Sequence, residues 1–112
     1  MLAAALVVLA CAALLGFALL TFALRRKHVP KGVALLHGAF AATGIVLLII
    51  DWIVAPRAPR GTTLLFIIAA IGGAVVFAKD LKEGSAPLAL ASVHGLLAII
   101  AFALLLGFFL TQ

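Results

Sequence analysis

Four long apolar segments dominate this 112-residue chain and limit what it can fold into. They run from about Leu2 to Leu24, Gly32 to Val54, Thr62 to Phe77 or Ala78, and Pro87 to Leu110. An apolar segment of about 18 or more residues can cross the hydrocarbon core of a bilayer as a helix. Because 68% of the residues are hydrophobic and 10% are charged, a water-soluble domain could not bury this much apolar surface. The sequence therefore predicts an all-α, integral membrane four-helix bundle, with residues 1–112 forming a single transmembrane domain.

Positive charges are distributed unevenly among the connections between these segments. The first and third connections hold six Lys or Arg residues and the second holds two: Arg25, Arg26, Lys27, Lys31, Lys79 and Lys82 against Arg57 and Arg60. Cytoplasmic loops of membrane proteins carry an excess of Lys and Arg. We therefore expect a multi-pass protein of the inner (cytoplasmic) membrane, with loops 25–31 and 79–86 in the cytoplasm and both termini outside. The basic loops are expected to contact anionic lipid headgroups rather than nucleic acid.

The two halves of the chain resemble each other when the sequence is shifted so that His37 falls on His94. Without a gap, this one shift, which we call the repeat offset, also aligns Pro30 with Pro87, Gly38 with Gly95, and Gly16 with Gly73. These matches are informative because the chain has only four prolines and three histidines. We expect two repeated helical hairpins, residues 1–55 and 58–112 approximately, related by a pseudo-two-fold axis along the membrane normal. The alternative is that the two hairpins acquired these matching residues independently, because both have the same local structural requirements.

Two histidines lie inside the apolar segments, about five residues into the second segment for His37 and about seven into the fourth for His94. Both positions are roughly 8 to 11 Å below the same membrane interface. Ionisable residues at such a depth are costly and are usually functional. Since the two helices are expected to run parallel, the two imidazoles are predicted to face each other across the bundle.

The chemistry around these histidines favours haem over a metal held by side chains alone. Zinc normally takes four ligands, or three and a water. Haem supplies four equatorial nitrogens itself, so His37 and His94 would suffice as axial metal ligands. The sequence contains no C-x-x-C-H motif, which predicts a non-covalent haem b.

Further residues are expected to complete this haem site. Small residues lie in line with each histidine at helical spacing and would leave a slot for the flat ring: Ala41, Gly44, Ala98 and Ala101. Lysines near the same interface, Lys31 and Lys82, could neutralise the propionates.

In these features the chain resembles the small membrane b-type cytochromes. The likeness rests on four spans, on an H-G pair in each of two spans, and on the small residues beneath, and it covers about residues 30–48 and 87–105. Relatives with two haems carry four histidines, whereas this chain has two in its spans, so the resemblance implies at most one haem per chain. It implies an electron-transfer role, with a quinone or a redox protein as partner.

Two other functions remain open from the residues. The small-residue stripes would also serve as packing seams in a cofactor-free assembly or scaffold subunit of a larger membrane complex or a homo-oligomer. A small four-span transporter is the other alternative, although the first segment lacks the carboxylate on which small multidrug-resistance transporters depend. Asp51 is expected to pair with Arg57 or Arg60 at the interface. No nucleophile is paired with a base, so no hydrolytic or transfer site is predicted.

Overall fold

A computed structural model describes residues 1–112 as four α-helices joined by short connections, with no strand. The helices are α1 (Leu2–Leu24), α2 (Lys31–Val54), α3 (Arg60–Glu83) and α4 (Leu88–Leu110). All four are long and apolar enough to cross a membrane. This confirms the predicted all-helical architecture of membrane-spanning length.

The third helix differs most from the sequence prediction. We expected it to end at Phe77 or Ala78, but α3 has 24 residues and continues to Glu83. It ends at Gly84, whose φ of 75° lies in the left-handed region and whose N–H donates to the carbonyl oxygen of Asp80. Glycine in this conformation is a common helix stop, because it carries no Cβ that would clash. Asp80 is therefore part of the helix rather than of the loop.

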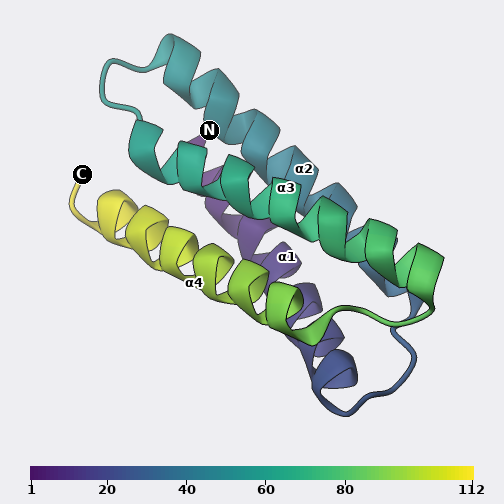
Figure 1. Ribbon diagram of the computed structural model, residues 1–112. Helices are drawn as coiled ribbons and strands as arrows, with labels where there is room; N and C mark the ends of the chain where they lie inside the picture. The colour runs from purple at the N-terminus through teal and green to yellow at the C-terminus, as the bar shows by residue number, and fades with distance from the viewer.

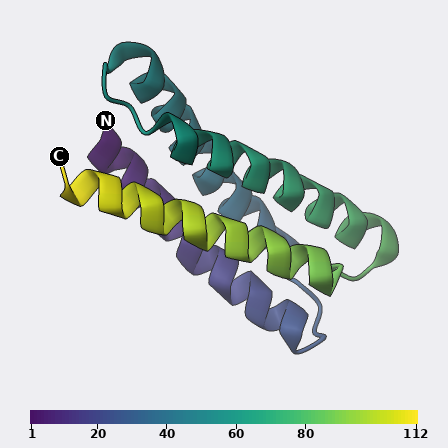
Figure 2. The same ribbon diagram turned by 60° about the vertical axis from the view of Figure 1, so that its left-hand side comes forward.

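The four helices form an elongated bundle, 44 Å long and about 20 Å across, in which two pairs lie on diagonals (Figures 1 and 2). α1 packs against α2 and α4, and α3 packs against the same two helices. The backbones of α1 and α3 do not approach each other, and neither do those of α2 and α4. Side chains from α2 and α4 can therefore meet only across the centre of the bundle.

The two ends of the bundle differ in charge. Both termini and the α2–α3 connection lie at one end, and the α1–α2 and α3–α4 connections lie at the other (Figures 1 and 2). We call the second the basic end, because it carries six of the eight Lys and Arg residues. The length of the bundle exceeds the hydrocarbon thickness of a bilayer, about 30 Å. Its charged ends can consequently reach the headgroup regions on both sides.

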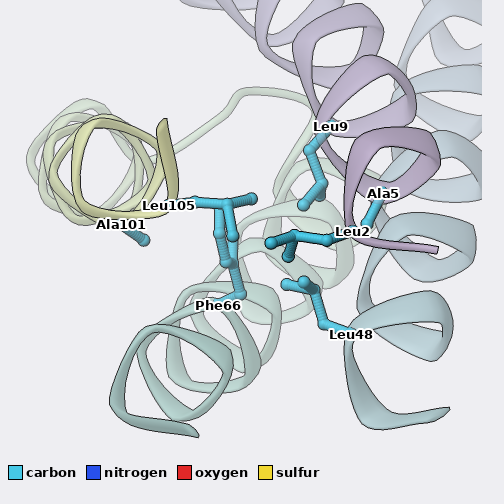
Figure 3. Packing of buried hydrophobic residues seen from close by; sticks show 7 residues of the cluster. All are labelled: Leu2, Ala5, Leu9, Leu48, Phe66, Ala101 and Leu105. Carbon is cyan, nitrogen blue, oxygen red and sulfur yellow. The ribbon is translucent and has the colours of Figure 1, made fainter. Parts of the chain in front are cut away.

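A cluster of apolar side chains fills the half of the bundle nearest the termini (Figure 3). Its buried members are Leu2, Ala5, Leu9, Leu48, Phe66, Ala101 and Leu105. Helix packing in membranes depends on close van der Waals contact, since lipid tails are as apolar as the side chains. The contact is tight at Gly44, where a Cβ would lie 2.5 Å from Cγ of Leu9.

This packing predicts that alanine substitutions at two glycines of α2 have different effects on stability. Gly44→Ala should lower the free energy of unfolding by about 1–3 kcal/mol, because the added methyl group overpacks the contact with Leu9. Gly38→Ala is the matched control, since no atom lies within 4 Å of a Cβ at that position. It should be neutral or stabilising by up to about 1 kcal/mol through helix propensity. Unfolding by SDS in mixed micelles measures both, and equal effects would contradict the packing described here.

Candidate functional site

His37 and His94 lie at the same depth on the two helices of one diagonal. Each is the seventh residue of its helix, because α2 begins at Lys31 and α4 at Leu88. Seven residues of α-helix correspond to about 10 Å from the basic end. The two ring centroids are 6.1 Å apart, and the ring planes are nearly perpendicular, at 88°. The two imidazoles thus meet at the centre of the bundle.

Each imidazole is fixed by the other helix of its own hairpin. Nδ1 of His37 lies 2.7 Å from the carbonyl oxygen of Ala12 in α1, and Nδ1 of His94 lies 2.6 Å from that of Ala69 in α3. A carbonyl oxygen only accepts hydrogen bonds, so Nδ1 is the protonated nitrogen in both rings. In the neutral imidazole, Nε2 is then left with a free lone pair.

The acceptors are main-chain atoms rather than the side-chain hydroxyls of Thr43 and Ser92, which lie on the same helices as the histidines. Thr43 donates to the carbonyl oxygen of Ala39 in its own helix, and Ser92 is exposed and makes no side-chain hydrogen bond. An alanine carbonyl gives no side-chain signal in a sequence. The repeat offset, which carries Ala12 onto Ala69 as it carries His37 onto His94, was the signal available.

Two glycines give the imidazoles access to these carbonyls. Gly16 and Gly73 each follow the accepting alanine by four residues. A side chain at that spacing leans toward the helix N-terminus and would cover the turn that holds the carbonyl. A Cβ at position 16 would lie 2.8 Å from Cε1 of His37, and one at position 73 would lie 2.7 Å from Cε1 of His94. Glycine is therefore required by close approach at both positions.

The small residues in line with the histidines occupy two environments. Ala41 and Ala98, one turn away from the rings, are half-buried. Gly44 and Ala101, a further turn away, are buried in the apolar half of the bundle. At Gly44 the neighbouring space is filled by the side chain of Leu9. Close to the rings, the imidazoles themselves fill the space that a side chain at Gly16 or Gly73 would occupy.

An ion pair joins α2 to α3 at the basic end. Nζ of Lys31 contacts Oδ2 of Asp80, whose side chain is only 4% exposed. Lys82, in contrast, is exposed and makes no ion pair. Asp80 was not predicted as a site residue, because the third span was expected to end at Phe77 or Ala78, before this position. Gly84, a typical helix stop, was the available signal.

At the opposite end, the pairing that we predicted for Asp51 is wrong. Its carboxylate forms no ion pair with Arg57 or Arg60. Asp51 lies within the last turn of α2, and its carbonyl oxygen instead accepts the N–H of Ala55. The ion pairs of the structure both lie at the basic end.

The donor set and spacing at the histidines fit a metal that needs two axial ligands. No group of three or more His, Cys, Asp or Glu residues is placed to hold a metal ion by side chains alone. The two ring centroids are 6.1 Å apart, and the Nδ1 hydrogen bonds leave Nε2 free on both rings. His37 and His94 are therefore the residues that would hold such a metal. The space beside Gly16 and Gly73 is occupied by the two imidazoles themselves.

Comparisons with known protein families, with curated proteins and with solved structures find no match to this chain. Support for any function therefore comes from the histidine site itself.

The hydrogen bonds predict one tautomer for both half-buried histidines, His37 and His94. In metal-free protein labelled with ¹⁵N-histidine, the nitrogen chemical shifts of His37 and His94 should report a protonated Nδ1 and an unprotonated Nε2. His28 is the internal control, because it is exposed and makes no side-chain hydrogen bond, so its two nitrogens should exchange protons with water. A protonated Nε2 on the ring of His37 or His94 would contradict the geometry.

Proposed function

We propose that the chain is a small membrane b-type cytochrome that binds one haem b non-covalently through Nε2 of His37 and Nε2 of His94. The observation that carries the proposal is the pair of Nδ1–carbonyl hydrogen bonds, which leaves both Nε2 lone pairs free on rings 6.1 Å apart. Neutral imidazole is the axial ligand that such haems use. The bound haem would supply one-electron oxidation and reduction.

The protein's own residues favour electron transfer over oxygen activation. Two axial histidines leave no open coordination position for oxygen. The Nδ1–H bonds to Ala12 and Ala69 hold the ring orientations and raise the basicity of the ligating nitrogens. Lys82, exposed at the basic end, would neutralise a propionate, whereas Lys31 is engaged with Asp80. The electron partner would be a quinone or a redox protein.

We further infer that the two hairpins are related by a pseudo-two-fold axis along the bundle. The contacts that support this all obey the repeat offset: His37 with His94, Ala12 with Ala69, and Gly16 with Gly73. The Lys31–Asp80 pair has no counterpart, because Leu88 and Ala23 occupy the corresponding positions. The symmetric part is therefore the histidine site, and the asymmetric part is the basic end.

A second function is favoured by a specific observation. Rings at this separation and angle also form an edge-to-face aromatic pair, for which centroid distances of about 4.5–7 Å are usual. The two hydrogen bonds tie α2 to α1 and α4 to α3. A cofactor-free scaffold subunit could use the histidines in this way, as packing residues. The spectrum of the purified protein distinguishes the two functions.

Purified protein from haem-replete cells should show the reduced-minus-oxidised spectrum of a low-spin b-type cytochrome, with about one haem per chain. His37→Ala and His94→Ala should each abolish the six-coordinate low-spin character, because one axial ligand is lost. The matched control is His28→Ala, which removes the exposed third histidine and should leave the spectrum unchanged.

Well-folded protein without a Soret band would reject the haem site and favour the packing function. A Soret band that survives replacement of both His37 and His94 would also reject it, because the ligands would then lie elsewhere. Gly73→Ala provides a finer test, since the added methyl group displaces the His94 ring without removing the ligand. It should lower haem occupancy, whereas Gly107→Ala, in open space on α4, should not.

The orientation that we propose places the basic end in the cytoplasm and both termini outside, in accordance with the positive-inside rule. In a Cys11→Ala background, single cysteines at positions 27 and 112 report the two sides. A membrane-impermeant thiol reagent applied to intact cells should label Gln112→Cys and spare Lys27→Cys. Labelling of position 27 but not of position 112 would show that the proposed orientation is wrong and that the basic end faces outside.

A further inference from the structure

A cavity of about 420 Å³ opens at the basic end, outside the histidine site. It is lined by the α1–α2 connection, by the last turn of α3 and by the α3–α4 connection. Its charged residues are Arg26, Lys27 and Asp80, and His28, Val29 and Leu88 also line it. The cavity lies at the ends of helices that are long enough to span a membrane, and therefore at headgroup level.

Asp80 gives this cavity an unused hydrogen-bond acceptor. Its Oδ2 contacts Nζ of Lys31, but its Oδ1 is buried and has no hydrogen-bond partner. Buried carboxylate oxygens nearly always have a donor, because an unpaired one loses its hydration without compensation. A second cationic or N–H group at this position would complete the carboxylate's bonding.

The two cationic side chains of the cavity, Arg26 and Lys27, favour an anionic ligand. Both are exposed, and neither makes an ion pair. Arginine matches phosphate oxygens with parallel N–H groups, and lysine adds a point charge. A ligand that satisfies the whole cavity thus carries a phosphate and, a few bonds away, a nitrogen with N–H donors. Val29 and Leu88 provide apolar wall beside it.

We propose that this cavity binds the phosphoethanolamine headgroup of a membrane lipid. The ammonium group donates a hydrogen bond to Oδ1 of Asp80, and Arg26 and Lys27 hold the phosphate. Phosphatidylcholine offers the same phosphate and the same charge but has no N–H donor. Phosphatidylglycerol offers the phosphate and hydroxyl donors without the cation. The proposal does not depend on haem binding.

A headgroup methylation series tests this directly. The purified full chain is mixed with equal amounts of lipids that share their acyl chains, and the retained lipid is quantified by native mass spectrometry. Phosphatidylethanolamine should be retained roughly tenfold more than phosphatidylcholine, the scale expected for one hydrogen bond to a charged group. The mono- and dimethylated forms, which keep an N–H, should stay closer to phosphatidylethanolamine. The proposal would be overturned if phosphatidylcholine or phosphatidylglycerol were retained as strongly as phosphatidylethanolamine.

Soluble glycerophosphoethanolamine distinguishes a lipid from a free phosphate compound. It should fail to displace the lipid at equal concentration, because it lacks the acyl chains that hold the headgroup at the interface. If it displaces the lipid fully, the ligand is a soluble compound and the lipid assignment is wrong.

Variants separate the two halves of the cavity. Asp80→Ala removes the acceptor oxygen and should abolish the preference for ethanolamine over choline lipid. Glu83→Ala is the matched control, because it removes a carboxylate from the same end but outside the cavity lining, and it should keep that preference. Arg26→Gln, which leaves Asp80 and Lys31 untouched, should weaken the binding of both lipids and keep the ratio of their affinities. A preference that survives in folded Asp80→Ala, or phosphate binding unaffected by Arg26→Gln, would contradict the proposal.

Discussion

The hydrogen bond from a histidine Nδ1–H to a main-chain carbonyl of the neighbouring helix is the interaction on which the rest of the site depends. Inside a bilayer no water is available to satisfy an imidazole, so each ring must find its partner in the protein. A carbonyl oxygen has two lone pairs and can accept this bond in addition to its helical one. Glycine four residues later keeps the carbonyl of Ala12 or Ala69 accessible. The ring position, the tautomer and the free Nε2 all follow from this contact.

The two histidine–carbonyl hydrogen bonds contribute more to the positions of the imidazole rings than to the free energy of unfolding. A hydrogen bond between membrane helices contributes about 1 kcal/mol, which is comparable to a well-packed apolar contact. The apolar cluster around Leu48 and Leu105 already fills the other half of the bundle. At the basic end, the Lys31–Asp80 pair connects the two hairpins, although burying a carboxylate carries a large desolvation cost. Polar groups thus occur where they hold a site in place.

The sequence predicted the architecture well and the polar contacts only partly. The limits of α1 follow directly from its apolar run, which ends at the basic residues beginning with Arg25. For α3 the same reasoning failed, because the end of an apolar run does not have to be the end of a helix. The main-chain hydrogen bonds of α3 continue through the mostly polar residues 79–83. The positions of His37 and His94 could be predicted from their equal depth. Their acceptors could not, because any residue type supplies a carbonyl.

The interior site also explains why the matches at the repeat offset involve glycine and alanine as well as histidine. Each hairpin needs a histidine that donates its Nδ1–H on one helix. On the other helix it needs an accepting carbonyl, followed four residues later by a glycine that leaves the carbonyl accessible. The ion pair and the cavity at the basic end need no such repetition, since each involves both hairpins. Two kinds of site, one repeated and one unique, therefore lie at different depths of one bundle.

Pulsed EPR of the oxidised protein, with ¹⁵N placed only at Nε2 of histidine, tests the proposed haem ligation. Ligation by His37 and His94 predicts strong ¹⁵N couplings to the iron from two equivalent directly bonded nitrogens, one from each residue, and a spectrum unchanged in His28→Ala. Label at Nδ1 alone should give only the weak coupling of a remote nitrogen. Strong coupling to Nδ1, or no histidine coupling in a protein that contains haem, would contradict the proposed ligation.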